Sequence, residues 1–118
     1  MSDRTWQREL FRVRYPDDAP ARITVFAQEF EIVDCSEAGL RYKLNGAAAP
    51  TSQSVDGKIR FAAGGTADVT GFVVRKEDEY VALKFAKAIS AVHIMNEQRW
   101  LRDHAAKQRA AAAQLAAK

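Results

Sequence analysis

Two short motifs hold the side chains that could recognise a ligand. The first is a pair of arginines, Arg8 and Arg12, separated by three residues. The second runs from Asp34 through Ser36 to Gly39 and has the pattern Asp-x-Ser-x-x-Gly. A guanidinium group binds phosphate oxygens and guanine edges through paired N–H groups, and it stacks on flat rings. We therefore expect a small anionic ligand with planar groups rather than a long polyanion.

Each motif also has an explanation that needs no ligand. Two arginines at positions i and i+4 lie on one face of a solvated helix, with Glu9 as a nearby partner. The side chains of Asp34 and Ser36 can cap the backbone N–H groups of an ordinary turn. The same groups can accept the N–H groups of a guanine, and a serine can donate to a phosphate. A glycine at position 39 permits a positive φ or the close approach of a ligand.

The composition excludes several other kinds of site. Eighteen Lys and Arg against fifteen Asp and Glu give a net charge of +3, which is too small to imply binding of long nucleic acid. Cys35 is the only cysteine, so neither an intramolecular disulfide nor a cysteine-based zinc site is expected. His93 and His104 are too far apart to hold one metal ion. We expect no metal and no cofactor.

The chain shows no feature of an enzyme. It contains no glycine-rich phosphate loop, no metal constellation and no nucleophile with a recognisable base. It also lacks an apolar stretch long enough to cross a membrane, and its first residues are charged rather than typical of a secretory signal. These patterns favour a cytoplasmic binding protein that does not insert into membranes.

The elements that must position the motifs fall into three zones of one domain. Residues 1–20 form an arginine-rich N-terminal arm that ends in a turn containing Pro16 and Pro20, residues 21–87 alternate like strands, and residues 88–118 read as a helix. Six strands are expected, and their polar outward positions indicate an antiparallel sheet closed into a barrel or a sandwich. Their approximate ranges are 22–26, 29–33, 40–44, 58–61, 69–76 and 80–85. The small, polar stretch 45–57 is expected to be a flexible loop.

The last zone has strong helical propensity, since alanine dominates it. Ser90 is a suitable N-cap, and Val92 and Met95, together with Trp100 or Leu101, offer an apolar stripe. Beyond Ala105 the tail contains few bulky apolar residues. This tail either frays or packs against a second copy in a homodimer.

Taken together and in this order, the two motifs resemble those of the PilZ domain family, bacterial receptors for cyclic di-GMP. The runs Thr70–Arg75 and Tyr80–Phe85 resemble the closing hairpin of that family. The resemblance covers roughly residues 4–100 and implies a mainly β fold, a six-stranded antiparallel barrel followed by a C-terminal α-helix. One departure is Gln7, which stands where many members of the family carry a further arginine.

The resemblance also implies a role for each motif residue. Arg8 and Arg12 would grip guanine edges and phosphates and stack on the bases. Asp34 and Ser36 would contact a guanine and the phosphodiester, and Gly39 would keep the turn open. A bidentate arginine–guanine pair contributes about 1–3 kcal/mol of discrimination.

The function that this predicts is a nucleotide-binding receptor in bacterial second messenger signalling. It would act on motility, exopolysaccharide production or biofilm formation through a downstream protein partner or a homodimer. One alternative is a protein-interaction adaptor that needs no nucleotide. Another is a barrel for single-stranded nucleic acid, which would require exposed strand aromatics. Because the strand aromatics follow the apolar parity, we expect them to be buried; they are Phe30, Tyr42, Phe61 and Phe85.

Overall fold

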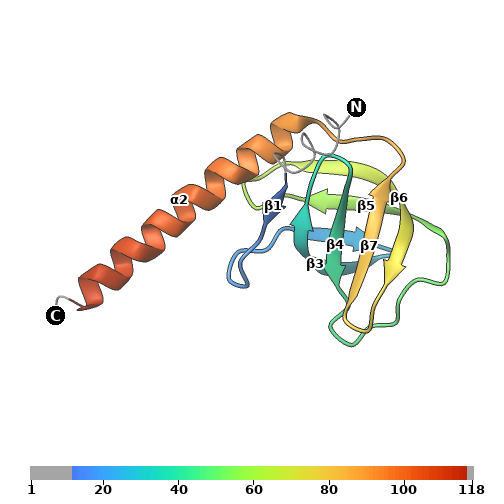
Figure 1. Ribbon diagram of the computed structural model, residues 1–118, viewed down its shortest axis with the longest axis horizontal. Coiled ribbons are helices and arrows are strands. Elements are labelled where there is room, and N and C mark those ends of the chain that lie inside the picture. Colours follow the sequence, from blue (N-terminus) through green and yellow to red (C-terminus); the bar gives the residue numbers. More distant parts are fainter. Residues whose placement is uncertain (1–11, 117–118) are drawn as a thin grey trace, which may run out of the picture.

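The computed structural model describes residues 12–116, which form seven strands followed by a long helix (Figure 1). The elements, in chain order, are β1 (Val13–Arg14), β2 (Arg22–Val25), β3 (Gln28–Cys35), β4 (Gly39–Lys43), β5 (Ser54–Arg60), β6 (Thr66–Lys76), β7 (Tyr80–Phe85) and α2 (Ala91–Ala116). The six predicted strands correspond to β2 through β7. The sequence pattern missed β1, because a strand of two residues has no periodicity to detect.

All strand pairings are antiparallel, and six strands close into a barrel. The sheet runs in the order β1-β3-β2-β5-β6-β7-β4, and an additional pairing of β3 with β4 closes the six strands from β3 to β4 into a ring. Strand β1 lies outside this ring and extends β3 by pairing Val13 with Cys35 and Arg14 with Asp34. The barrel that the resemblance implies is therefore confirmed, and the sandwich is excluded.

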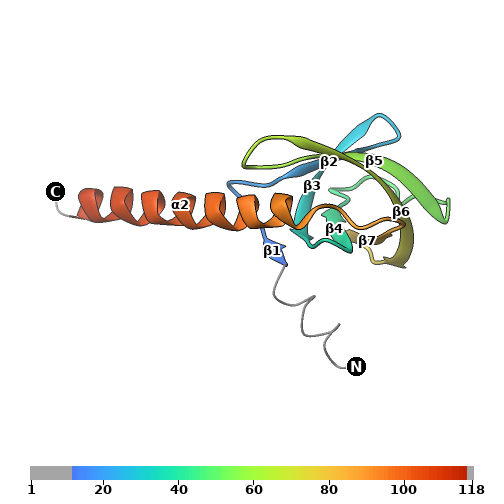
Figure 2. The same cartoon turned by 90° about the horizontal axis from the view of Figure 1, so that it is seen from above.

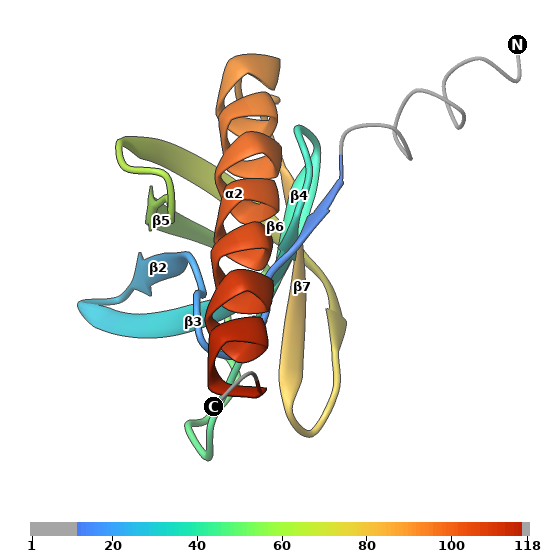
Figure 3. The same ribbon diagram turned by 90° about the vertical axis from the view of Figure 1, so that its left-hand side faces the viewer.

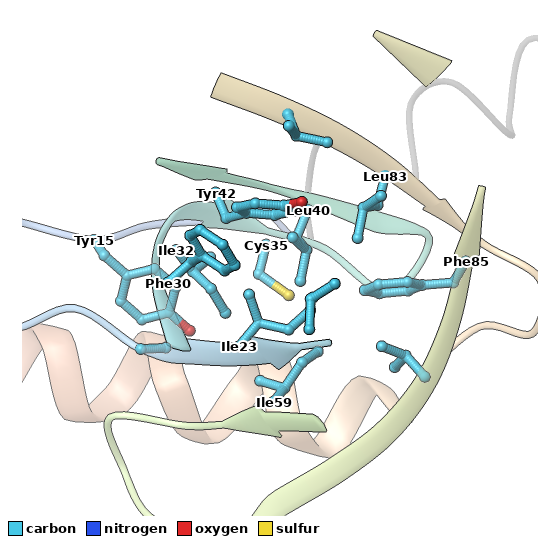
Figure 4. Close-up of a cluster of buried hydrophobic side chains, with 14 of the residues drawn as sticks. Tyr15, Ile23, Phe30, Ile32, Cys35, Leu40, Tyr42, Ile59, Leu83 and Phe85 are labelled. Carbon is cyan, nitrogen blue, oxygen red and sulfur yellow. The ribbon is translucent and has the colours of Figure 1, made fainter. Parts of the chain in front are cut away.

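Inward-facing side chains from every barrel strand fill its interior (Figure 4). All four strand aromatics that the sequence predicted to be buried are less than 9% exposed. Phe30 packs against Tyr42 with their ring centroids 4.8 Å apart. These rings therefore form the hydrophobic core, and they do not offer the stacking surface that a single-strand nucleic-acid barrel needs.

The expected loop between β4 and β5 is shorter than predicted. Strand β5 begins at Ser54, so Ser54–Gly57 pair with Phe72–Val69 of β6. Only Val55 of these four residues points into the core, where it is 3% exposed. A single apolar residue among small and polar neighbours gives too weak an alternation to reveal a strand end.

The helix begins next to the barrel and then leaves it (Figures 1 and 2). Ser90 caps it as predicted, since its Oγ accepts the N–H of Val92 at 3.2 Å. The predicted apolar stripe is wrong at Val92 and Met95, which are more than half exposed, and it is confirmed at Leu101, which packs partly buried against the core. The helix also completely buries Ile94 and Glu97, which the prediction did not include. The residues from Ala105 to Leu115 are exposed, so the described part of the tail buries little.

A buried carboxylate fastens the helix to the rest of the fold. Glu97 Oε1 accepts the Tyr15 hydroxyl at 2.5 Å and the Ala62 N–H at 2.8 Å, and Oε2 accepts the Ala63 N–H at 2.7 Å. Burial and the neighbouring Glu97 raise the pKa of Tyr15 above its ordinary value, so the phenol remains a donor. Strand β1 lies beside α2 (Figures 1 and 3). This contact fixes the base of the N-terminal arm.

Candidate functional site

Asp34 lies at the end of β3 and is only 3% exposed. Its Oδ2 accepts two hydrogen bonds from Arg41 of β4, from Nε at 3.0 Å and from Nη2 at 2.6 Å. Arg12 Nη1 lies 3.4 Å from the same oxygen. The hydrogen bonds to Asp34 raise the pKa of Arg41 further above its ordinary value, so the guanidinium stays charged. The buried carboxylate therefore has two cationic partners of unequal closeness.

The turn that follows is held by its own serine. Ser36 Oγ accepts the Ala38 N–H at 3.2 Å and donates to the Gly39 carbonyl oxygen at 3.4 Å. The backbone N–H of Ser36 also donates to that carbonyl, at 2.8 Å. The turn-capping interpretation of Ser36 is confirmed. Its hydroxyl lies at the rim of the barrel, because the turn joins β3 to β4.

Gly39 is required by the packing of two strands rather than by a positive φ. Its φ lies outside the left-handed region, in contrast to Gly46, Gly64 and Gly65. A Cβ atom at this position would overlap the carbonyl oxygen of Leu83 in β7. The glycine thus lets β4 and β7 approach each other beside the turn.

The arm meets the turn through β1. Because β1 pairs with the end of β3, Arg12 is held within reach of Asp34. Arg8 lies outside the described residues. Of the predicted site residues, the structure brings Arg12, Asp34, Ser36 and Gly39 to one groove.

This groove has a volume of about 570 Å³ and runs across the outer face of β3, β4, β7 and β6. Four of its side chains are cationic and one is acidic, so its lining carries a net positive charge. The residues that line it are Arg12, Asp34, Ser36, Ala38, Gly39, Leu40, Arg41, Val74, Arg75, Ala82, Leu83 and Lys84. Such a lining suits an anionic ligand.

Strand register explains why residues distant in sequence share the groove. Asp34 lies opposite Arg41, Arg41 lies opposite Ala82, and Ala82 lies opposite Arg75. Register shifts in β3 and in β6 both fall in this transverse row, where a bulge re-aims the neighbouring side chains. The small Ala82 leaves open the space between the two arginines.

The motifs alone did not identify the other cations of the groove. Arg41, Arg75 and Lys84 belong to strand patterns that looked like ordinary alternation. Their outward parity was visible in the sequence, but the pairing of β4 with β7 was not. Only that pairing shows that they face the same hollow as Asp34.

A larger hollow, of about 880 Å³, lies beside the start of α2, and it is lined neither by Arg12 nor by any of residues 34–39. Its charged lining is balanced, with Lys58 and Lys87 against Asp56 and Asp68. It offers no excess charge to an anion. The smaller groove is the stronger candidate because its lining carries a net positive charge and includes residues of both motifs.

The remaining candidate groups are structural. Cys35 is buried, and desolvation raises the pKa of its thiol to about 12, so it is not a nucleophile at neutral pH. His93 stacks on Phe61, and His104 stacks on Trp100. Among residues 12–116, no three metal-ligating side chains gather in one place.

Comparison with known proteins identifies the family of this chain. The family model described as the PilZ domain matches residues 3–103. The chain belongs to the PilZ domain family. PilZ domains are in general of the cyclic di-GMP-binding type, and they serve as ligand-binding or adaptor domains rather than as catalysts.

The fold of this PilZ domain also resembles a solved structure. A crystal structure of the uncharacterised Legionella protein Lpg0364 superposes with a TM-score of 0.55 at 18% identity, covering 79% of this chain and 95% of that one. At this identity the likeness concerns the fold alone. No curated protein matches the sequence significantly. Within the described part of the chain, no helix has the length and apolar character needed to cross a membrane.

Proposed function

We propose that this PilZ domain is a cytoplasmic receptor for cyclic di-GMP and that the groove of Asp34 and Arg41 is its binding site. The observation that carries the proposal is the meeting of the arm with the turn. Arg12, which precedes β1, lies 3.4 Å from the carboxylate of Asp34 in a groove of net positive charge. Cyclic di-GMP carries two phosphates and two guanines, which match the cations and the acid of this groove.

The expected contacts follow from the chemistry of each group. Hydrogen bonds from the described residues reach only Oδ2 of Asp34, so Oδ1 can accept the N–H groups of a guanine edge. Arg8 and Arg12 bind a phosphate or a guanine edge and stack on the bases. Arg75 and Lys84 line the same groove, and their charges would neutralise a second phosphate.

The arm, residues 1–20, supplies the signal. When its arginines close over the ligand, the base of the arm is already fixed by β1 and by the bond from Tyr15 to Glu97. Reordering of the arm against the barrel would then change the surface that a downstream protein partner or a second copy meets. We propose motility, exopolysaccharide production or biofilm formation as the output.

One observation favours a second candidate, an adaptor that binds no nucleotide. Asp34 is already neutralised by Arg12 and Arg41, and Ser36 already serves the turn. A site that satisfies itself in this way needs no ligand to be stable. An adaptor would use the same barrel only as a surface for other proteins.

Isothermal titration calorimetry with cyclic di-GMP distinguishes the two candidates. The receptor gives saturable heat, and the double variant Arg8→Ala/Arg12→Ala reduces the affinity at least tenfold, since each arginine contributes about 1–3 kcal/mol. The matched control is Arg22→Ala, which removes a half-exposed arginine of β2 outside the groove. Absence of heat with the wild-type protein refutes the receptor. Unchanged affinity in a folded double variant refutes the assignment of the arginines.

A further inference from the structure

Arg41 and Arg12 share one oxygen of Asp34 but hold it differently. Arg41 donates through two nitrogens, at 3.0 and 2.6 Å, whereas the single contact of Arg12 is 3.4 Å. The side chain of Arg12 is also the more exposed, at 57% against 37% for Arg41. Arg41 is therefore the firm partner of the carboxylate, and Arg12 is the loose one.

The fold fixes Arg41 in place. It lies on β4, directly opposite Asp34 in the register, and β4 is paired with β3 on one side and with β7 on the other. Its guanidinium also lies 6.0 Å from the ring centroid of Tyr80. Arg12, in contrast, precedes the two-residue strand β1 at the edge of the sheet.

A buried carboxylate needs a cationic partner at every stage of binding. Breaking a buried pair by removing one partner is strongly unfavourable, because an uncompensated charge remains. If Arg12 turns from Asp34 to a phosphate of the ligand, Asp34 loses its weaker partner. Arg41 still neutralises Asp34. Because it donates to Oδ2, it also holds the carboxylate with Oδ1 available to the ligand.

We propose that Arg41 is a positioning residue, which keeps Asp34 charged and oriented so that Arg12 can exchange the carboxylate for a ligand phosphate. The proposal rests on the cyclic di-GMP site described above and adds a residue outside both motifs. It predicts that Arg41 acts on affinity only through Asp34. A residue that bound the ligand directly would act independently of Asp34.

A double-mutant cycle on the affinity for cyclic di-GMP tests this coupling. Arg41→Gln weakens binding by about tenfold in the wild-type background and by less than about threefold in the Asp34→Asn background, where no buried charge needs a partner. Arg41→Lys keeps the charge but loses the paired donors, and it shows the same pattern with a smaller loss. The lysine variant also provides the test if the glutamine variant does not fold.

The matched control is Lys43→Gln. Lys43 lies two residues further along β4, pairs with Asp17 at 3.1 Å and does not line the groove. Lys43→Gln should leave the affinity for cyclic di-GMP unchanged both in the wild-type background and in the Asp34→Asn background. Circular dichroism confirms that each variant is folded, so that a change in stability is not read as a change in affinity.

The outcomes separate the two proposals. No heat with the wild-type protein refutes the receptor itself. Heat with the wild type, together with equal losses for Arg41→Gln in both backgrounds, refutes the positioning role and makes Arg41 a direct contact. Heat with the wild type and no loss for either Arg41 variant also overturns the positioning role, while the receptor stands.

Discussion

Replacing Glu97 with glutamine should destabilise the fold far more than its position on a mostly exposed helix suggests. The side chain is completely buried and accepts three hydrogen bonds, from Tyr15, Ala62 and Ala63. The glutamine oxygen can replace Oε1, but the NH₂ group then faces the N–H of Ala63, a donor against a donor. The backbone N–H of Ala63 therefore loses its acceptor, and the hydrogen bonds from Tyr15 and Ala62 are no longer made to a charged group.

The magnitude follows from these three bonds. An unsatisfied buried donor costs about 1–3 kcal/mol, and a neutral hydrogen bond is about 1 kcal/mol weaker than one to a charged group. Two weakened bonds and one orphaned amide give a loss of about 3–5 kcal/mol. The total free energy of unfolding of a small domain is about 5–15 kcal/mol, so the variant should remain folded but be only marginally stable.

Urea unfolding followed by circular dichroism measures this loss. The control is Glu29→Gln, which removes a partly exposed carboxylate paired with Arg60 at 2.9 Å and should cost no more than about 1 kcal/mol. Tyr15→Phe removes only one of the three donors and should lie between the two. If Glu97→Gln proves no more costly than Glu29→Gln, then the buried carboxylate does not fasten the helix, and the reasoning fails.

Two further predictions concern Cys35, which follows Asp34, and Gly39, which ends the second motif. Burial raises the pKa of Cys35 from 9.0 to about 12, so the thiol favours folding below pH 9 and this contribution is lost as the pH rises from 9 to 12. The free energy of unfolding should therefore fall more steeply in that window for the wild type than for Cys35→Ala, by at most about 1.4 kcal/mol per pH unit; parallel curves would contradict the buried thiol. Gly39→Ala should destabilise the protein by about 1–3 kcal/mol, because the new methyl group meets the backbone carbonyl of Leu83. Thermal and urea unfolding test this, and an unchanged midpoint would show that β4 and β7 are not so close.

Local patterns were enough to predict most of the barrel. Strands β2, β4 and β7 show clear alternation of apolar and polar residues, and this alternation follows from burial of one face only. The helix was equally visible, since alanine-rich segments favour it. The face that it buries was not, because Ile94 and Glu97 are one turn apart and a glutamate does not look like a core residue. What makes Glu97 a core residue is a tyrosine that lies 82 positions earlier in the chain.

The candidate site divides in the same way. The two motifs are visible in the chain, since the residue types and their spacing define a pair of guanidinium groups and an acid–hydroxyl turn. The folded barrel was needed to show that Arg41 holds Asp34, that Arg75 and Lys84 face the same groove, and that Gly39 is required by a neighbouring strand. Charge and packing act across strands, and the register of those strands is set by the whole barrel rather than by any one segment.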